Sequence, residues 1–272
     1  MKRVPLSKGV YILPSLFTTG SLFCGFYSIV HAVSGDFFKA TTAIFVAAFL
    51  DLLDGRVARL TGSESDFGVE YDSLVDLVSF GLAPAMLLYL WSLKDLGRIG
   101  WLAAFVYFAC GALRLARYNI QIETVEKKRF EGLPIPAAAL TLISFVIFFN
   151  AGYGIESLRQ PLSLFFPFLL GPLMVSRIPY RSFKDLDFKK SSNAFYILVA
   201  MVGVILVIAS DPERMLFYLG LLFITAGPAE KVIDIWKLYR QKAVTPKKES
   251  WGKRIRKMTL LPNHRQQDKQ SS

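Results

Sequence analysis

The chain has 272 residues, of which 53% are hydrophobic, and its formal net charge is +11. Its apolar runs reach the length needed to cross a hydrocarbon core of about 30 Å, which excludes an ordinary water-soluble domain. They are also too long and continuous for the alternating strands of a membrane β-barrel. Only helices or closed barrels satisfy backbone polar groups in lipid, so the sequence predicts an all-α, polytopic integral membrane bundle.

The hydrophobic runs predict about eight transmembrane helices. We place them at residues 14–33, 39–59, 71–92, 98–117, 134–153, 161–178, 194–210 and 214–234. The basic N-terminus is not followed by a small-residue cleavage site, so we expect the first span to be uncleaved. Residues 241–272 are rich in Lys, Arg and Gln and are expected to be disordered.

The distribution of Lys and Arg predicts the orientation. With both termini on one side, 27 of the 32 Lys and Arg residues fall in the N-terminus, alternate loops and the tail. The remaining five are Lys39, Lys94, Arg98, Arg159 and Arg214. This positive-inside pattern predicts that both termini are cytoplasmic. The basic residues flank membrane spans, so we expect anionic membrane lipids as partners and no nucleic acid.

Four aspartates interrupt the apolar pattern where the second span ends and the third begins. Asp51 and Asp54 are three residues apart, and Asp72 and Asp76 are four apart. On helices, each spacing places both carboxylates on one face. Four carboxylates repel one another unless cations lie among them, and Mg²⁺ and Mn²⁺ prefer oxygen ligands. A two-metal site of this kind suits phosphoryl transfer.

A helix cap or a pairing with Arg explains a single acidic residue equally well. Four at these spacings, with Gly, Ala and Arg between them, favour a site. Gly55 and Ala58 allow a flat ligand to approach the helix backbone, and Arg59 can donate two hydrogen bonds to a phosphate. Gly68 permits a tight loop, and Ser65 can donate to a phosphate or sugar. Together these features indicate a nucleotide diphosphate site at the membrane surface.

The segment DLLDGRVARLTGSESDFGVEYDSLVD at 51–76 resembles the full signature of the CDP-alcohol phosphotransferases, with every defining position filled. The resemblance implies a site with two Mg²⁺ or Mn²⁺ ions held by four side chains: Asp51, Asp54, Asp72 and Asp76. It implies that Asp76 is the catalytic general base. For CDP-diacylglycerol, it implies contacts from five residues: Thr18, Gly55, Ala58, Arg59 and Ser65.

Other segments resemble the bacterial membrane-integral (type II) phosphatidylserine synthases. They are GALRLARYN at 111–119, RFEGLPIPAAA at 129–139 and PLMVSRIPYRSFK at 172–184. The resemblance implies a family domain over 1–185 with a six-helix core, two additional C-terminal transmembrane helices over 186–240, and the basic tail. Within GALRLARYN, Arg114, Arg117 and Asn119 are candidates for binding the serine carboxylate or a lipid phosphate.

The resemblance implies that the enzyme transfers a phosphatidyl group from CDP-diacylglycerol to L-serine, giving phosphatidylserine and CMP. Homodimers are common among such relatives, so a homodimer is expected. Two alternatives stay open. One is the same chemistry with glycerol 3-phosphate, inositol or choline as the acceptor. The other is an ion-coupled transporter, which should place its carboxylates near the bilayer centre on discontinuous helices.

The first span departs from the family pattern at one position. Relatives commonly carry Asn seven residues after the Pro of PSLFTTGSLFCGF, and Ser21 stands there instead. This substitution puts in doubt the nucleotide contacts of the first helix, although the Ser hydroxyl can still donate a hydrogen bond.

Overall fold

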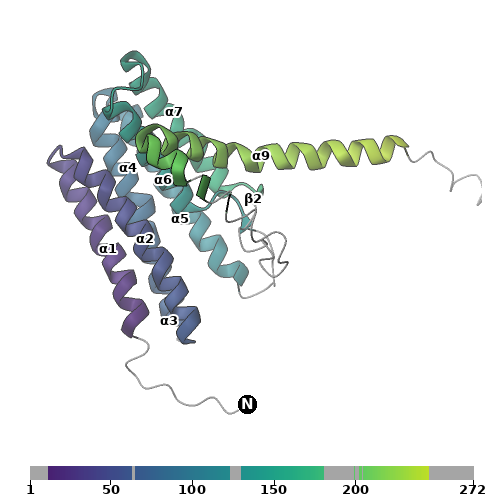
Figure 1. Ribbon diagram of the computed structural model, residues 1–272, viewed down its shortest axis with the longest axis horizontal. Helices are drawn as coiled ribbons and strands as arrows, with labels where there is room; N and C mark the ends of the chain where they lie inside the picture. Colours follow the sequence, from purple (N-terminus) through teal and green to yellow (C-terminus); the bar gives the residue numbers. More distant parts are fainter. Residues whose placement is uncertain are drawn as a thin grey trace, which may run out of the picture. The chain divides into compact units, whose positions relative to one another are not determined.

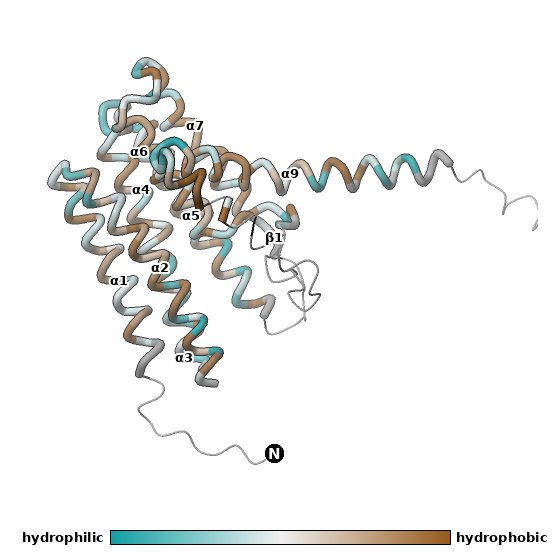
Figure 2. The backbone as a smooth tube through the Cα atoms, viewed as in Figure 1, coloured by the Kyte–Doolittle hydropathy of each residue, from teal (hydrophilic) through white to brown (hydrophobic). Residues whose placement is uncertain are grey.

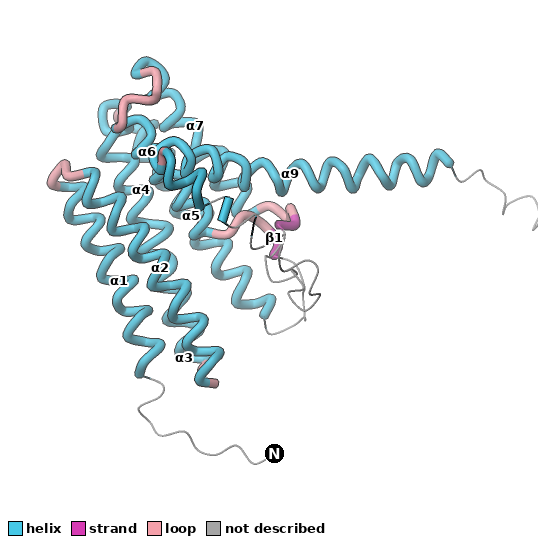
Figure 3. Tube along the Cα trace, in the orientation of Figure 1, coloured by secondary structure: helices cyan, strands magenta, loops and turns pink. Residues whose placement is uncertain are grey.

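The computed structural model describes residues 12–62, 65–122, 130–180, 199, 202–203 and 205–244. The chain forms two compact units, Met1–Pro228 and Ala229–Ser272. Figure 3 shows that the described chain is almost entirely helical, which confirms the predicted all-α membrane fold. About half of the predicted seventh span and most of the tail lie outside the described residues.

Figure 1 shows the order of the elements along the chain. The α-helices are α1 (Ile12–Val33), α2 (Phe37–Thr61), α3 (Asp66–Asp76), α4 (Ala83–Leu88), α5 (Arg98–Ile122), α6 (Ile135–Asn150), α7 (Glu156–Val175) and α9 (Pro212–Val244). The π-helices η2 (Leu77–Leu82) and η3 (Tyr89–Leu93) and the 3₁₀ turn η4 (Lys94–Leu96) complete the segment that begins with α3. The two-residue strands β1 (Phe130–Glu131) and β2 (Pro179–Tyr180) pair antiparallel.

By length and composition, five helices of the described chain can cross a membrane. They are Ser15–Val33, Asp66–Leu96, Arg98–Ile120, Glu156–Val175 and Pro212–Lys237. The helix α2 is not among them because its apolar run also holds Lys39, Asp51, Asp54, Arg56 and Arg59. With 16 residues, α6 falls short of the roughly 20 needed for a span, although most of it is buried. Figure 2 shows hydrophobic stretches in the helices and hydrophilic residues beside the label α3.

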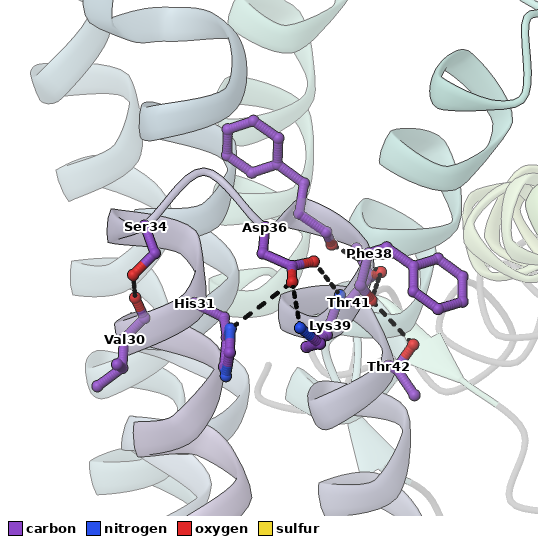
Figure 4. A network of polar contacts seen from close by, with 9 residues as sticks. Val30, His31, Ser34, Asp36, Phe38, Lys39, Thr41 and Thr42 are labelled. Carbon is purple, nitrogen blue, oxygen red and sulfur yellow. Dashed lines mark hydrogen bonds and ion pairs between the residues drawn. The ribbon is translucent and has the colours of Figure 1, made fainter.

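The helices α1 and α2 form a hairpin whose turn is held by a polar network (Figure 4). Asp36 caps α2 by accepting the backbone N–H of Lys39 at 3.1 Å, and Lys39 Nζ lies 2.7 Å from Asp36 Oδ2. Gly35 has a φ of 80°, a conformation that favours glycine, and therefore permits the tight turn. The hairpin thus starts α2 in a defined register.

At the connection between α2 and α3, both helix ends have their own caps. Gly62, with φ 61°, ends α2 and donates its N–H to the Ala58 carbonyl. Ser65 begins α3 by accepting the Gly68 N–H at 3.1 Å. From there the chain is helical to Leu96, through two π-helical turns.

The helices α5, α6 and α7 are brought together by small residues. A Cβ added at Gly111 in α5 would lie 2.8 Å from Ile135 in α6, and one at Gly171 in α7 would lie 3.2 Å from Cys110 Sγ. Aromatic rings fill the opposite part of this bundle, where Trp91, Phe145 and Phe149 pack closely. These contacts fix α5, which carries three of the candidate site residues.

Candidate functional site

Three of the four predicted carboxylates meet at one place. Asp51 comes from α2, and Asp72 and Asp76 come from α3. One oxygen of each lies within 4.8 Å of the oxygens of the other two, and all three side chains are half-buried. Asp51 and Asp76 are also within hydrogen-bonding reach of each other. Asp72 and Asp76, which follow Asp51 by 21 and 25 positions in sequence, therefore form one cluster with it.

Asp54 does not belong to this group of three. It lies one turn further along α2, its side chain is buried, and its Oδ2 has no hydrogen-bond partner among the described residues. The hydroxyl of Thr18 on α1 is within hydrogen-bonding reach of Asp54. The structure thus places Thr18 and Asp54 together, beside the three clustered carboxylates.

Hydrogen bonds from α1 and α5 hold α3 in position. Thr19 Oγ1 and Tyr71 Oη lie 3.0 Å apart and link α1 to α3. On the other side, Ser73 donates to Asn119 Oδ1 at 3.1 Å, and Asn119 Nδ2 donates to Glu70 at 3.3 Å. The residues of each pair are 46 to 52 positions apart, so a single sequence carries no local signal for them.

The cluster has the properties of a cation site. Its ligands are carboxylate oxygens, the type that Mg²⁺ and Mn²⁺ prefer. Asp76 Oδ1 in the cluster and Asp54 Oδ2 beside it are buried, and neither has a hydrogen-bond partner in the described chain. A buried carboxylate oxygen without a partner is costly, and like charges this close destabilise the protein unless a cation balances them. The residues present therefore fit a divalent metal.

A buried arginine lies beside the cluster. Arg114 on α5 is only 7% exposed, and it is close enough to Asp76 for an electrostatic attraction. Its Nε has no hydrogen-bond partner among the described residues. Burying a guanidinium with an unused donor is unfavourable unless a ligand completes it. Arg114 is therefore the best placed of the three acceptor-site candidates.

The other two candidates on α5 have structural contacts. Arg117 donates to the carbonyls of Val175 and Ser176 at 2.7 and 3.2 Å, and so satisfies the end of α7. Asn119 is engaged with Ser73 and Glu70, as described above. Binding of an acceptor by Arg117 or Asn119 stays a prediction, and these contacts give both residues a role in positioning helices.

The candidate nucleotide contacts lie along the last turns of α2. Arg59 is exposed, and its Nε donates to the Gly55 carbonyl at 2.7 Å. The nearest atom to a Cβ added at Gly55 is Arg59 Nη2, at 3.9 Å, so the surface there is open. Ala58 is half-buried on the same helix. The Ser65 oxygen accepts from Gly68 as the cap of α3, and its hydroxyl proton can still be donated.

A family model described as CDP-alcohol phosphatidyltransferase matches residues 11–172, more than half of the chain. The chain belongs to the CDP-alcohol phosphatidyltransferase family. Three relatives are named CDP-diacylglycerol–serine O-phosphatidyltransferase. That of Helicobacter pylori is 39% identical over 79% of this chain and 89% of its own length. The Methanocaldococcus jannaschii protein is 38% identical over 68% and 81%. The Bacillus subtilis protein is 40% identical over 51% and 77%.

Membership of the CDP-alcohol phosphatidyltransferase family confirms the resemblance found in the signature at 51–76. The chain is an integral membrane protein, and the reaction of its family depends on metal ions in general. The matched segment ends at residue 172. The domain boundary at 185 and the roles assigned to individual residues stay predictions.

Proposed function

We propose that this chain transfers the phosphatidyl group of CDP-diacylglycerol to L-serine and releases CMP, so that phosphatidylserine remains in the membrane. The observation that carries the proposal is the meeting of Asp51, Asp72 and Asp76 within the family signature. The names of the relatives support serine as the acceptor.

In this proposal the four aspartates Asp51, Asp54, Asp72 and Asp76 hold two Mg²⁺ or Mn²⁺ ions. When bound, such ions polarise phosphoryl oxygens and balance the charge that develops on the leaving CMP. Asp54, which lies one turn from Asp51 on α2, would supply a further carboxylate to these ions. Thr18 supports this arrangement by orienting the Asp54 carboxylate.

Asp76 acts as the general base. Its carboxylate takes the proton of the serine hydroxyl, whose oxygen attacks the β-phosphorus, the one that carries diacylglycerol. A new P–O bond to serine forms as the bond between the β-phosphorus and the CMP oxygen breaks. The proximity of Asp76 to both Asp51 and Arg114 supports this role, because a base must lie where the acceptor and the phosphate meet.

The nucleotide lies along α2, with the cytidine near Gly55 and Ala58 and the diphosphate near Arg59. Arg59 uses only its Nε–H on the Gly55 carbonyl, so the N–H groups of its two terminal nitrogens can donate to a phosphate. Ser65 donates its hydroxyl proton to the CDP group. Arg114 binds the serine carboxylate, which would complete its unused donor.

The active site and both termini face the cytoplasm, and the basic flanks contact anionic lipids. The concentration of Lys and Arg on one side of the predicted spans supports this orientation. There, a water-soluble alcohol and a lipid-anchored nucleotide can meet. A homodimer is the proposed assembly, as the resemblance implies.

The test is an acceptor screen on the purified full-length protein. It receives CDP-diacylglycerol, Mn²⁺ and one alcohol at a time, chosen from serine, glycerol 3-phosphate, inositol and choline, and CMP release is measured. Serine is expected to be the productive acceptor. Release with another alcohol but not with serine would overturn the assignment, and release with none of them would favour the transporter alternative.

The variant Asp76→Asn tests the base. Loss of a positioned base costs roughly 10²- to 10⁴-fold in rate, so CMP release should collapse. Binding of CDP-diacylglycerol should be retained in part, because three of the four ligands remain. A variant with near-normal CMP release would remove Asp76 from this role.

A further inference from the structure

A π-helical turn begins at the residue that follows Asp76. It covers Leu77–Leu82, and it is closed by a bond from the Ala83 N–H to the Val78 carbonyl, five residues back. Such wide turns are rare and often occur at functional sites. Each inserts about one extra residue into an α-helix. The turn therefore sets how the helix that carries Asp72 and Asp76 is rotated relative to the rest of its span.

Pro84 favours the wide turn, and Tyr107 completes it. Proline has no backbone N–H, so Pro84 cannot donate the α-helical bond to the Phe80 carbonyl, four residues back. Tyr107 on α5 donates its hydroxyl to that same carbonyl at 3.0 Å. Tyr107 is fully buried, as is Phe80, so water cannot replace the bond. The hydroxyl of Tyr107 thus donates to the carbonyl to which Pro84 cannot donate the α-helical bond.

The opposite side of the turn is held by α1. Ser79 donates its hydroxyl to the Ser21 carbonyl at 3.0 Å, and Ser21 donates its own to the Ala47 carbonyl of α2 at 3.1 Å. Gly25 allows this close approach, because a Cβ there would lie 2.8 Å from Ser79 Cα. The turn is therefore held on one side by contacts with α1 and on the other by the buried Tyr107 hydroxyl of α5.

We propose that Tyr107 is a positioning residue for the acidic cluster, acting through the π-helical turn η2. Without its hydroxyl, the buried Phe80 carbonyl loses this hydrogen bond, so the turn is no longer held to α5 and its helical register can change. Removing one residue from a helical turn rotates the segment by about 100° and shifts it by about 1.5 Å. Asp76 would then move away from Asp51, on the other helix. This inference rests on the proposed function only for its activity readout.

The first variant to test is Tyr107→Phe, which keeps the ring and removes the hydroxyl. Residues that orient metal ligands typically change metal affinity or activity about 10- to 100-fold, and we expect the lower end here. The dissociation constant for Mn²⁺, measured by electron paramagnetic resonance, should rise about tenfold. The kcat for CMP release should fall by a similar factor, with the KM for serine nearly unchanged.

Tyr180→Phe is the matched control. Tyr180 is also buried, and it also donates its hydroxyl to a backbone carbonyl, that of Ile224 at 3.2 Å. Its partner lies in α9 rather than in the π-helical turn. We expect both variants to lose thermal stability without metal, but only Tyr107→Phe to lose Mn²⁺ affinity. Equal effects of the two substitutions on Mn²⁺ affinity would overturn the proposal.

A double variant separates positioning from stability. Tyr107→Phe with Pro84→Ala returns an N–H to the Phe80 carbonyl, so thermal stability should recover while Mn²⁺ affinity stays low. Recovery of affinity together with stability would overturn the proposal, because satisfying the carbonyl would then be enough. Should Tyr107→Phe not fold, Pro84→Ala alone gives the test, since its new N–H competes with Tyr107 and should weaken Mn²⁺ binding. Unchanged affinity in that variant would contradict the proposal.

The metal measurements keep this proposal distinct from the proposed function. Weakened Mn²⁺ binding in Tyr107→Phe, with no transfer to serine by the wild-type protein, would overturn the assigned reaction and support the positioning role. Normal transfer to serine by the wild type, with unchanged Mn²⁺ affinity in the variant, would do the reverse.

Discussion

The charged side chains at the two ends of α2 have opposite surroundings. At the start of the helix, Asp36 accepts the backbone N–H of Lys39, lies 2.7 Å from its Nζ, and has His31 Nδ1 at 3.9 Å (Figure 4). The hydrogen bonds from Lys39 hold the pKa of Asp36 below its ordinary value. This carboxylate is therefore stabilised as an anion by the protein alone.

Near the other end of α2, the carboxylates face one another instead. Asp51 lies with Asp72 and Asp76, and the buried oxygens Asp54 Oδ2 and Asp76 Oδ1 have no hydrogen-bond partner in the described chain. Arg114 is the nearby cation, and its Nε is also unused. A carboxylate with hydrogen-bond and ion-pair partners in its own chain stabilises the fold. A buried charged group without such partners indicates that a ligand binds there.

Asp51→Asn should have the largest effect on activity, and it removes one of the carboxylates on which the contrast between the two ends of α2 depends. Asparagine nearly keeps the size of the side chain but removes one negative charge and one strong metal ligand. CMP release should fall by about 100-fold or more, as expected when a metal-assisted phosphoryl transfer loses a ligand. Without metal, the variant should melt at a higher temperature than the wild type, because one repulsion is gone.

A relief of about 1 kcal/mol corresponds to a rise of roughly 2–4 °C for a protein of this size. The two quantities are measured by CMP release and by thermal unfolding in a chelating buffer. Lower thermal stability of metal-free Asp51→Asn would mean that the cluster is a structural network, and the contrast between the ends of α2 would fail.

The acidic end of α2 was largely predictable from the sequence. The three- and four-residue spacings of Asp51, Asp54, Asp72 and Asp76 placed each pair on one helix face, and the signature brought the pairs together. The separation of Asp54 from the other three was not predictable, because it depends on how α2 is rotated against α3. The boundary of α6 was wrong by three residues at its end, since Ala151 and Gly152 are apolar but leave the helix.

The contacts that hold the cluster could not be predicted from the sequence, for a physical reason. The π-helical turn after Asp76 shifts the helical register by about one residue, which hydrophobic periodicity does not resolve. Pro84 was the available signal for an irregular turn. In the sequence, Arg117 belongs to a motif that suggests substrate binding. In the structure its hydrogen-bond partners are the carbonyls of Val175 and Ser176, which are 58 and 59 positions away. One sequence cannot pair residues at such distances.

Asn119→Ala should give an intermediate effect and sharpen the comparison between satisfied and unsatisfied groups. It removes the hydrogen bonds to Ser73 and Glu70, each worth about 1 kcal/mol. If Asn119 positions α3, kcat should fall by roughly 5- to 30-fold with little change in the KM for serine. Steady-state kinetics with serine as the varied substrate measures both.

Ser73→Ala is the control for this prediction, because it removes one of the same bonds from the α3 side. A smaller loss of kcat in the same direction is expected. A large rise in the KM for serine in Asn119→Ala, without one in Ser73→Ala, would instead make Asn119 part of the acceptor site.

Asp36→Asn should give the smallest effect, because this end of α2 lies apart from the chemistry. Asparagine also caps helices, so the loss is confined to the charge interactions with Lys39 and His31. CMP release should stay within about twofold of the wild type.

The pKa of Asp36 is lowered in the folded protein, so its stabilisation is present above about pH 4 and is lost as the pH falls through the folded pKa. Thermal unfolding should therefore separate the two proteins slightly at pH 7, and the difference should shrink as the pH falls below about 4. A difference that persists in acid would show that Asp36 acts through its shape rather than its charge, and the two ends of α2 would then differ less than their contacts suggest.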